Sequence, residues 1–104
     1  MLIYCAHCYG GKSKNKALVE AKIKILQKRQ PDCTFVSPIH AFGFMYNTLS
    51  YDEGMKLCFS LLSKCDALLV LSEESEGVKR EIEYAKQHCK PILWLPQKKG
   101  DGNA

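Results

Sequence analysis

Long apolar runs are missing from this sequence. No stretch approaches the roughly 20 apolar residues that a helix needs to cross a bilayer, so we do not expect a membrane protein. Residues 1–5 carry neither a basic segment nor a long apolar core, which argues against a secretory leader and favours a cytoplasmic location. They are instead typical of a strand that begins almost at the first residue.

A large excess of one charge is also missing. Fifteen Lys and Arg residues oppose 11 Asp and Glu residues, for a net charge of +4, and no segment interleaves arginines with aromatic side chains. This balance does not predict a nucleic-acid surface. The lysines of residues 12–29 form a solvated helix face in the simplest interpretation, and they could also attract a phosphate-bearing ligand.

Cysteines are plentiful, but the pattern that would make them metal ligands is incomplete. Cys5 and Cys8 form a single CxxC pair, whereas a structural zinc site needs four ligands, usually from two such pairs. A redox CxxC site lacks its usual context as well. We therefore expect reduced and mostly buried thiols, with no metal and no organic cofactor. The six cysteines are Cys5, Cys8, Cys33, Cys58, Cys65 and Cys89.

Apolar β-type segments alternate with helical segments along the 104 residues. This order predicts one α/β domain over residues 1–96, with residues 97–104 as a polar tail. The expected architecture is a small flavodoxin-like or Rossmann-like three-layer sandwich around a mainly parallel sheet of four to five strands. We predict strands at 2–5, 33–36, 66–71 and 91–95, and helices at 13–29, 50–63 and 77–88.

Two of these helices carry more detailed signals. In the helix over 13–29 we expect the buried face to consist of Ala17, Leu18, Ala21 and Ile25. The helix over 50–63 begins with the pattern of a capping box, a serine at position 50 and a glutamate three residues later.

Residues 39–49 are apolar and aromatic without a clear period. One interpretation is a loop that caps a pocket or packs on a partner chain, and the other is a short extra helix that completes the core. Because small α/β domains often complete a shallow site by twofold pairing, we expect a homodimer in which residues 39–49 or 51–62 take part.

The helix that follows the central strand provides the strongest chemical signal. Ser75 and Gly77 stand at its beginning, where free backbone N–H groups and the helix dipole favour an anion. Glu81 lies about one turn further, and helical side chains lean toward the N-terminus, so its carboxylate can reach the same edge of the sheet. Gly10 and Gly11 follow the first strand and lie at this edge too.

These residues resemble a known family. The pattern Ser75-x-Gly77-x-x-x-Glu81, with Tyr84 and Ala85 after it, is similar to the nucleoside 2-deoxyribosyltransferase superfamily, and in particular to its branch that hydrolyses deoxynucleoside 5′-monophosphates. Residues 4–12 resemble the substrate loop of that branch. The resemblance covers residues 2–95, without a match in 39–50.

The resemblance implies a retaining N-glycosidase or deoxyribosyltransferase that acts on a small nucleoside or nucleotide. Glu81 would be the nucleophile that attacks the anomeric carbon. The residues implied to hold the 5′-phosphate or the sugar hydroxyls are Ala6, His7, Tyr9, Gly10, Gly11, Ser75 and Gly77.

One position departs from the family pattern. Family enzymes carry an aspartate in the helix before the central strand, and that register falls on Cys58 here. Asp52 and His40 are the candidates to supply the second catalytic group. Two alternatives to an enzyme stay open, namely a nucleotide-binding module without catalysis and an interaction protein that docks through the aromatic residues 42–46.

Overall fold

A computed structural model describes residues 1–96, and the tail predicted at 97–104 lies outside them. Four parallel strands form one sheet in the order β2-β1-β3-β4, which confirms the α/β class predicted from the sequence. The strands are β1 (Leu2–Ala6), β2 (Thr34–Val36), β3 (Ala67–Val70) and β4 (Ile92–Trp94). The helices are α1 (Ser13–Arg29), α2 (Pro38–Phe42), the 3-10 helix η1 (Gly43–Thr48), α3 (Tyr51–Ser63) and α4 (Glu76–Gln87).

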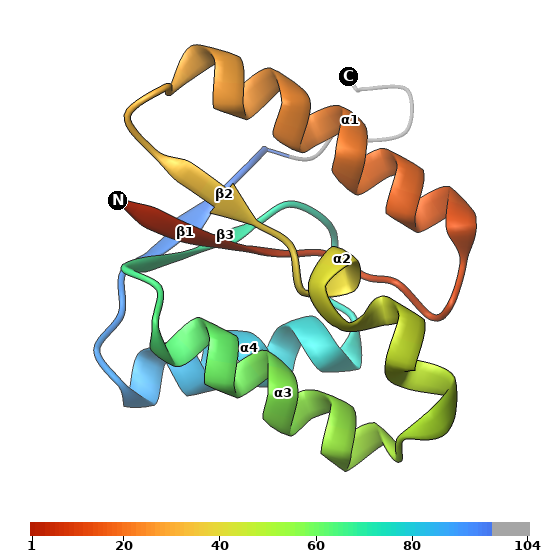
Figure 1. Ribbon diagram of the computed structural model, residues 1–104. Helices are drawn as coiled ribbons and strands as arrows, with labels where there is room; N and C mark the ends of the chain where they lie inside the picture. Colours follow the sequence, from red (N-terminus) through yellow and green to blue (C-terminus); the bar gives the residue numbers. More distant parts are fainter. Residues whose placement is uncertain (97–104) are drawn as a thin grey trace.

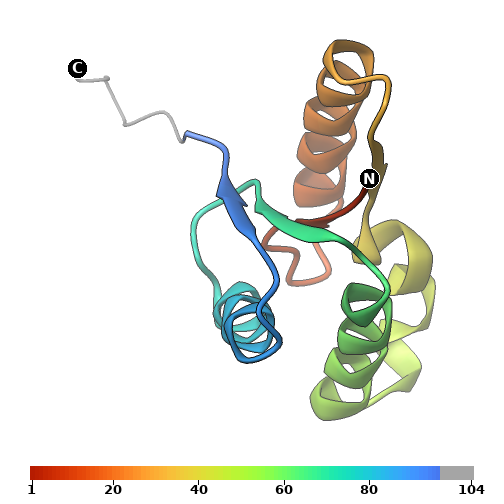
Figure 2. The same cartoon turned by 90° about the vertical axis from the view of Figure 1, so that its left-hand side faces the viewer.

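The helices cover both faces of the sheet (Figure 1). α1 lies on one face, whereas α3 and α4 lie side by side on the other, as the turned view also shows (Figure 2). The chain first adds β2 on one side of β1 and then crosses to β3 on the other side, so the strand order reverses between β1 and β3. The loops that leave these two strands diverge at their carboxyl ends, where open parallel sheets bind ligands.

Alternation along β1 divides the core in two. Tyr4 and Ala6 pack toward α3 and α4, whereas Ile3 and Cys5 pack toward α1. β3 is buried at every position because it lies between β1 and β4 and is covered on both faces, as predicted from its continuous apolar sequence. Within residues 1–96, no helix combines the length and the apolar character that a membrane crossing requires.

The buried face predicted for α1 is wrong. Leu18 and Ile25 are 41% and 53% exposed, whereas Val19 is completely buried and Ile23 and Leu26 are packed beneath the helix. Both sets of residues follow the helical period, so the sequence offered two apolar stripes on one helix. The sheet selects the stripe at 19, 23 and 26 because those side chains meet the apolar residues of β1 and β3.

The segment over residues 39–49 forms short helices, which confirms the second of the two interpretations. Ser37 caps α2 by accepting a hydrogen bond from the His40 amide, and Pro38 occupies the first helical position, where its missing N–H is not needed. η1 then carries the chain across to α3 (Figure 1). Phe44 remains 79% exposed.

The capping box predicted at the beginning of α3 is present. The Ser50 hydroxyl accepts from the Glu53 amide at 3.1 Å, and the Glu53 carboxylate accepts from the Ser50 amide at 2.8 Å. We expect Ser50→Ala to lower the free energy of unfolding by about 1 kcal/mol, as measured by urea denaturation, because the Glu53 amide loses its acceptor. Ser60→Ala is the matched control on the exposed face of the same helix, and an equal loss there would contradict the assignment.

Candidate functional site

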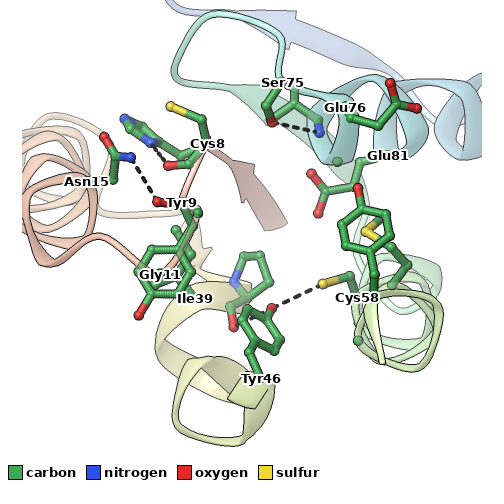
Figure 3. Close-up of a pocket in the computed structure, with 18 of the residues that line it drawn as sticks. Cys8, Tyr9, Gly11, Asn15, Ile39, Tyr46, Cys58, Ser75, Glu76 and Glu81 are labelled. Carbon is green, nitrogen blue, oxygen red and sulfur yellow. Dashed lines mark hydrogen bonds between the residues drawn. The ribbon is translucent and has the colours of Figure 1, made fainter. Parts of the chain in front are cut away.

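A cavity of about 730 Å³ opens at the carboxyl edge of the sheet. Its walls come from the loop after β1, from α2 and η1, and from the first turns of α3 and α4 (Figure 3). The volume falls within the range typical of small-molecule sites. Most of the residues predicted for the site line this cavity together, namely His7, Tyr9, Gly10, Gly11, Ser75, Gly77 and Glu81.

Three of the predicted residues do not line the cavity. Ala6 is completely buried in β1, with its side chain in the core on the side of α3 and α4. Asp52 is 79% exposed and pairs with Arg80 at 3.2 Å on the outer side of α3 and α4. His40 faces α1, where its Nε2 lies 2.7 Å from the Glu20 carboxylate. Neither side chain therefore supplies a second catalytic group to the cavity.

Glu81 is the buried carboxyl group of the site. It is only 5% exposed, and its carboxylate points into the cavity (Figure 3). Tyr4 donates its hydroxyl proton to Glu81 Oε2 from beneath, in β1. Burial raises the Glu81 pKa to about 7, although the hydrogen bond from Tyr4 acts in the opposite direction. Because that value is close to neutrality, the carboxyl group changes its charge in the physiological range.

Tyr4 is a site residue that the sequence analysis missed. Its side chain is completely inaccessible, and burial raises its pKa well above the usual value, so it stays a neutral donor. A signal was present in the sequence, because a tyrosine in the middle of a buried strand needs a partner for its hydroxyl group. The sequence could not show that the partner is a residue 77 positions further along the chain.

Cys58 faces the cavity from α3, and Tyr46 of η1 lies against it. The Tyr46 hydroxyl is 3.3 Å from Cys58 Sγ (Figure 3). Burial raises the pKa of both groups. At neutral pH the pair is therefore an uncharged hydroxyl and thiol.

The loop after β1 is held in place by polar contacts to its neighbours. His7 Nδ1 lies 2.7 Å from the Cys8 carbonyl oxygen, and Lys22 Nζ lies 3.0 Å from His7 Nε2. Lys22 also donates to the Leu71 carbonyl, while the Ser72 hydroxyl accepts from the Cys8 amide. These contacts require a neutral His7 with its proton on Nδ1, and burial lowers its pKa accordingly.

The first turn of α4 completes the cavity. The Ser75 hydroxyl accepts from the Val78 amide at 3.3 Å and thereby caps the helix. A side chain at Gly77 would come within 3.3 Å of the Tyr51 hydroxyl, so glycine allows α3 and α4 to approach here. Gly10 and Gly11 adopt left-handed backbone conformations, with φ of 60° and 72°, which glycine accepts without strain.

Fold and site together define a small α/β protein with a ligand-sized cavity at the carboxyl edge of a parallel sheet. The chain belongs to the family described as "Domain of unknown function (DUF4406)", whose model matches residues 3–94. A search of curated proteins finds no match to the chain. Among residues 1–96, no group of three or more His, Cys, Asp or Glu side chains is arranged to hold a metal ion.

Proposed function

We propose that the protein cleaves the N-glycosidic bond of a nucleoside or nucleotide, with Glu81 as the nucleophile. The observation that carries this proposal is the buried Glu81 carboxyl group, which Tyr4 orients by a hydrogen bond. Within residues 1–96, no positively charged side chain forms an ion pair with it. A carboxylate that faces a cavity without an ion-pair partner is suited to attack an electrophilic carbon. The resemblance of residues 75–85 to nucleoside 2-deoxyribosyltransferases supports the same role.

The chemistry follows from the two oxygens of this carboxylate. Tyr4 occupies Oε2 and leaves Oε1 for the anomeric carbon. Attack displaces the base and forms a glycosyl ester, which water then hydrolyses with retention of configuration. A second base in place of water gives deoxyribosyl transfer.

A second part of the cavity lining suits an anionic group on the sugar. The first turn of α4 directs backbone amides to this region, and the Ser75 hydroxyl lies beside them. Gly10, Gly11 and Lys12 line the same cavity from the loop after β1. A 5′-phosphate bound between these two segments would place the sugar next to Glu81.

A nucleotide-binding module without catalysis is the second candidate. It is favoured by Cys58, which stands in the register where the resemblance implies an aspartate. The third hypothesis, an interaction protein that docks on a partner through residues 42–46, has less support. The cavity is open, and Tyr46 of this segment lines it.

The experiment that separates these functions is a panel of ribo- and deoxyribonucleosides, each tested beside its 5′-monophosphate. Release of free base is followed by chromatography, and binding is followed by the shift in melting temperature. We expect base release, faster from the monophosphates. Stabilisation without release would favour the binding module, and neither effect with any compound would overturn both candidates.

The homodimer and the cytoplasmic location stay predictions. The location is supported by the cysteines, all six of which are unpaired. Cys5, Cys58 and Cys65 are buried, as expected for structural thiols, whereas Cys89 is exposed. A reduced thiol on the surface is typical of a reducing compartment.

A further inference from the structure

The acids around the cavity are few. Among the lining residues in the described part of the chain, carboxyl groups come from Glu76 and Glu81 alone. Glu76 is exposed, and Figure 3 shows its carboxylate turned away from the centre of the cavity. Glu81 is needed as the nucleophile. No carboxyl group therefore remains within residues 1–96 to protonate a leaving base.

Three further polar groups at the cavity, those of His7, Tyr46 and Cys58, are poor proton donors for a leaving base. Both ring nitrogens of His7 already have partners, the Cys8 carbonyl and the Lys22 ammonium group. Burial raises the pKa of Tyr46 and of Cys58, so both hold their protons more firmly than usual. General acid catalysis needs a donor with a pKa near the working pH, and these groups do not provide it.

The charge of the base decides whether such a donor is needed. When a neutral adenine or cytosine leaves, the electron pair of the broken C1′–N bond makes the base an anion unless a proton arrives. When the base is already a cation, such as a pyridinium, the same electron pair neutralises it and it leaves without a proton. Water then attacks C1′, the bond to Glu81 breaks, the carboxylate recovers its electron pair, and one proton passes to solvent.

The cavity also matches a cationic base by charge and shape. The Glu81 carboxylate lies in it without a positively charged partner among residues 1–96. Three tyrosine rings line the same space, and those of Tyr9 and Tyr46 are 6.1 Å apart and inclined by 56°. Aromatic faces attract cations, most strongly where water is displaced. Lys12 and the first turn of α4 provide the complementary positive end for a phosphate.

We propose that this site acts on N-glycosides whose leaving base carries a positive charge, with pyridinium 5′-nucleotides as the substrate class. The proposal rests on the proposed glycosidase function and narrows it. It requires that Glu81 attack the anomeric carbon and that the base leave without a general acid.

The test compares two substrates that differ mainly in the charge of the base. Nicotinamide mononucleotide carries a pyridinium cation, and its reduced dihydropyridine form is neutral with nearly the same shape. Both are supplied in ribo and 2′-deoxyribo forms at pH 8, beside the common neutral nucleotides, and Glu81→Gln serves as the blank. We expect kcat/KM for the cationic member to exceed that for its neutral partner by about 100-fold or more, which is the contribution typical of a general acid.

Two outcomes would overturn the inference, and they have different consequences. Cleavage of neutral nucleotides at rates equal to or above those of the pyridinium nucleotides would refute the preference for a cationic base and leave the proposed glycosidase function intact. No cleavage of any compound by the wild-type protein would refute the glycosidase function, and this inference with it.

Discussion

Replacement of Glu81 by glutamine should abolish base release, with a loss of about 10³-fold or more in kcat/KM, because an amide oxygen does not form the glycosyl ester. The amide has nearly the shape of the carboxyl group, and its oxygen still accepts the Tyr4 hydroxyl proton. Binding of nucleotides with a neutral base should therefore persist while turnover disappears. The measurement is single-turnover base release together with ligand-induced stabilisation of both proteins.

The same substitution should stabilise the fold above neutral pH. The Glu81 pKa is raised from 4.5 to about 7 in the folded protein, so the folded state binds more protons than the unfolded state between these values. The contribution of this group to the free energy of unfolding is therefore fully present below pH 4.5. It decreases as the pH rises and is completely lost above pH 7. The shift corresponds to a deficit of about 3 kcal/mol, which Glu81→Gln removes.

Urea denaturation at pH 4.5 and pH 8 measures this effect. We expect Glu81→Gln to resemble the wild type at pH 4.5 and to exceed it clearly at pH 8. Asp52→Asn is the matched control, because that carboxylate is exposed and pairs with Arg80 outside the cavity. Asp52→Asn should keep its activity, and a loss comparable to that of Glu81→Gln would mean that Asp52 takes part in the chemistry.

Replacement of Tyr4 by phenylalanine should move the pH–rate profile of kcat/KM toward higher pH. Glu81 acts as a carboxylate, so the rate should rise as the pH passes through its pKa. Tyr4 stabilises this carboxylate by donating to Oε2, and its loss favours the neutral acid. A hydrogen bond to a charged group is worth about 1.5–3 kcal/mol, which corresponds to a shift of about one to two pKa units.

The pH–rate profile of Tyr4→Phe distinguishes a role of Tyr4 in positioning Glu81 from a role in the stability of the fold alone. We expect Tyr4→Phe to lose activity by about 10-fold or more at pH 7 and to recover most of it at pH 9, because the lost hydrogen bond shifts the titration of Glu81. Cys58 and Tyr46 also interact with Glu81, and burial raises the pKa of both. The loss of Tyr4 leaves the Cys58 thiol protonated still more firmly, so neither group accounts for the shift. Tyr84→Phe is the control outside the cavity, where the ring stacks on Phe59 and His88. An equal loss at every pH would contradict the role assigned to Tyr4.

Local signals in the sequence determined the order of the elements and many of their ends. The helix over 13–29 coincides with α1, and the capping box at Ser50 marks the beginning of α3. Such signals are reliable because they depend on residues within one or two turns of each other. The meeting of Ser75, Gly77 and Glu81 with the loop after β1 was also predictable, because parallel strands present their carboxyl ends at one edge of the sheet.

The tertiary structure alone decided the contacts between side chains distant in sequence. α1 had two apolar stripes, and only the shape of the sheet selected the one at Val19. Asp52 and His40 had the right chemistry for a second catalytic group, but Arg80 and Glu20 hold them outside the cavity. A periodicity or a motif specifies which residues share a face, whereas the partner that a charged side chain finds depends on which elements pack together.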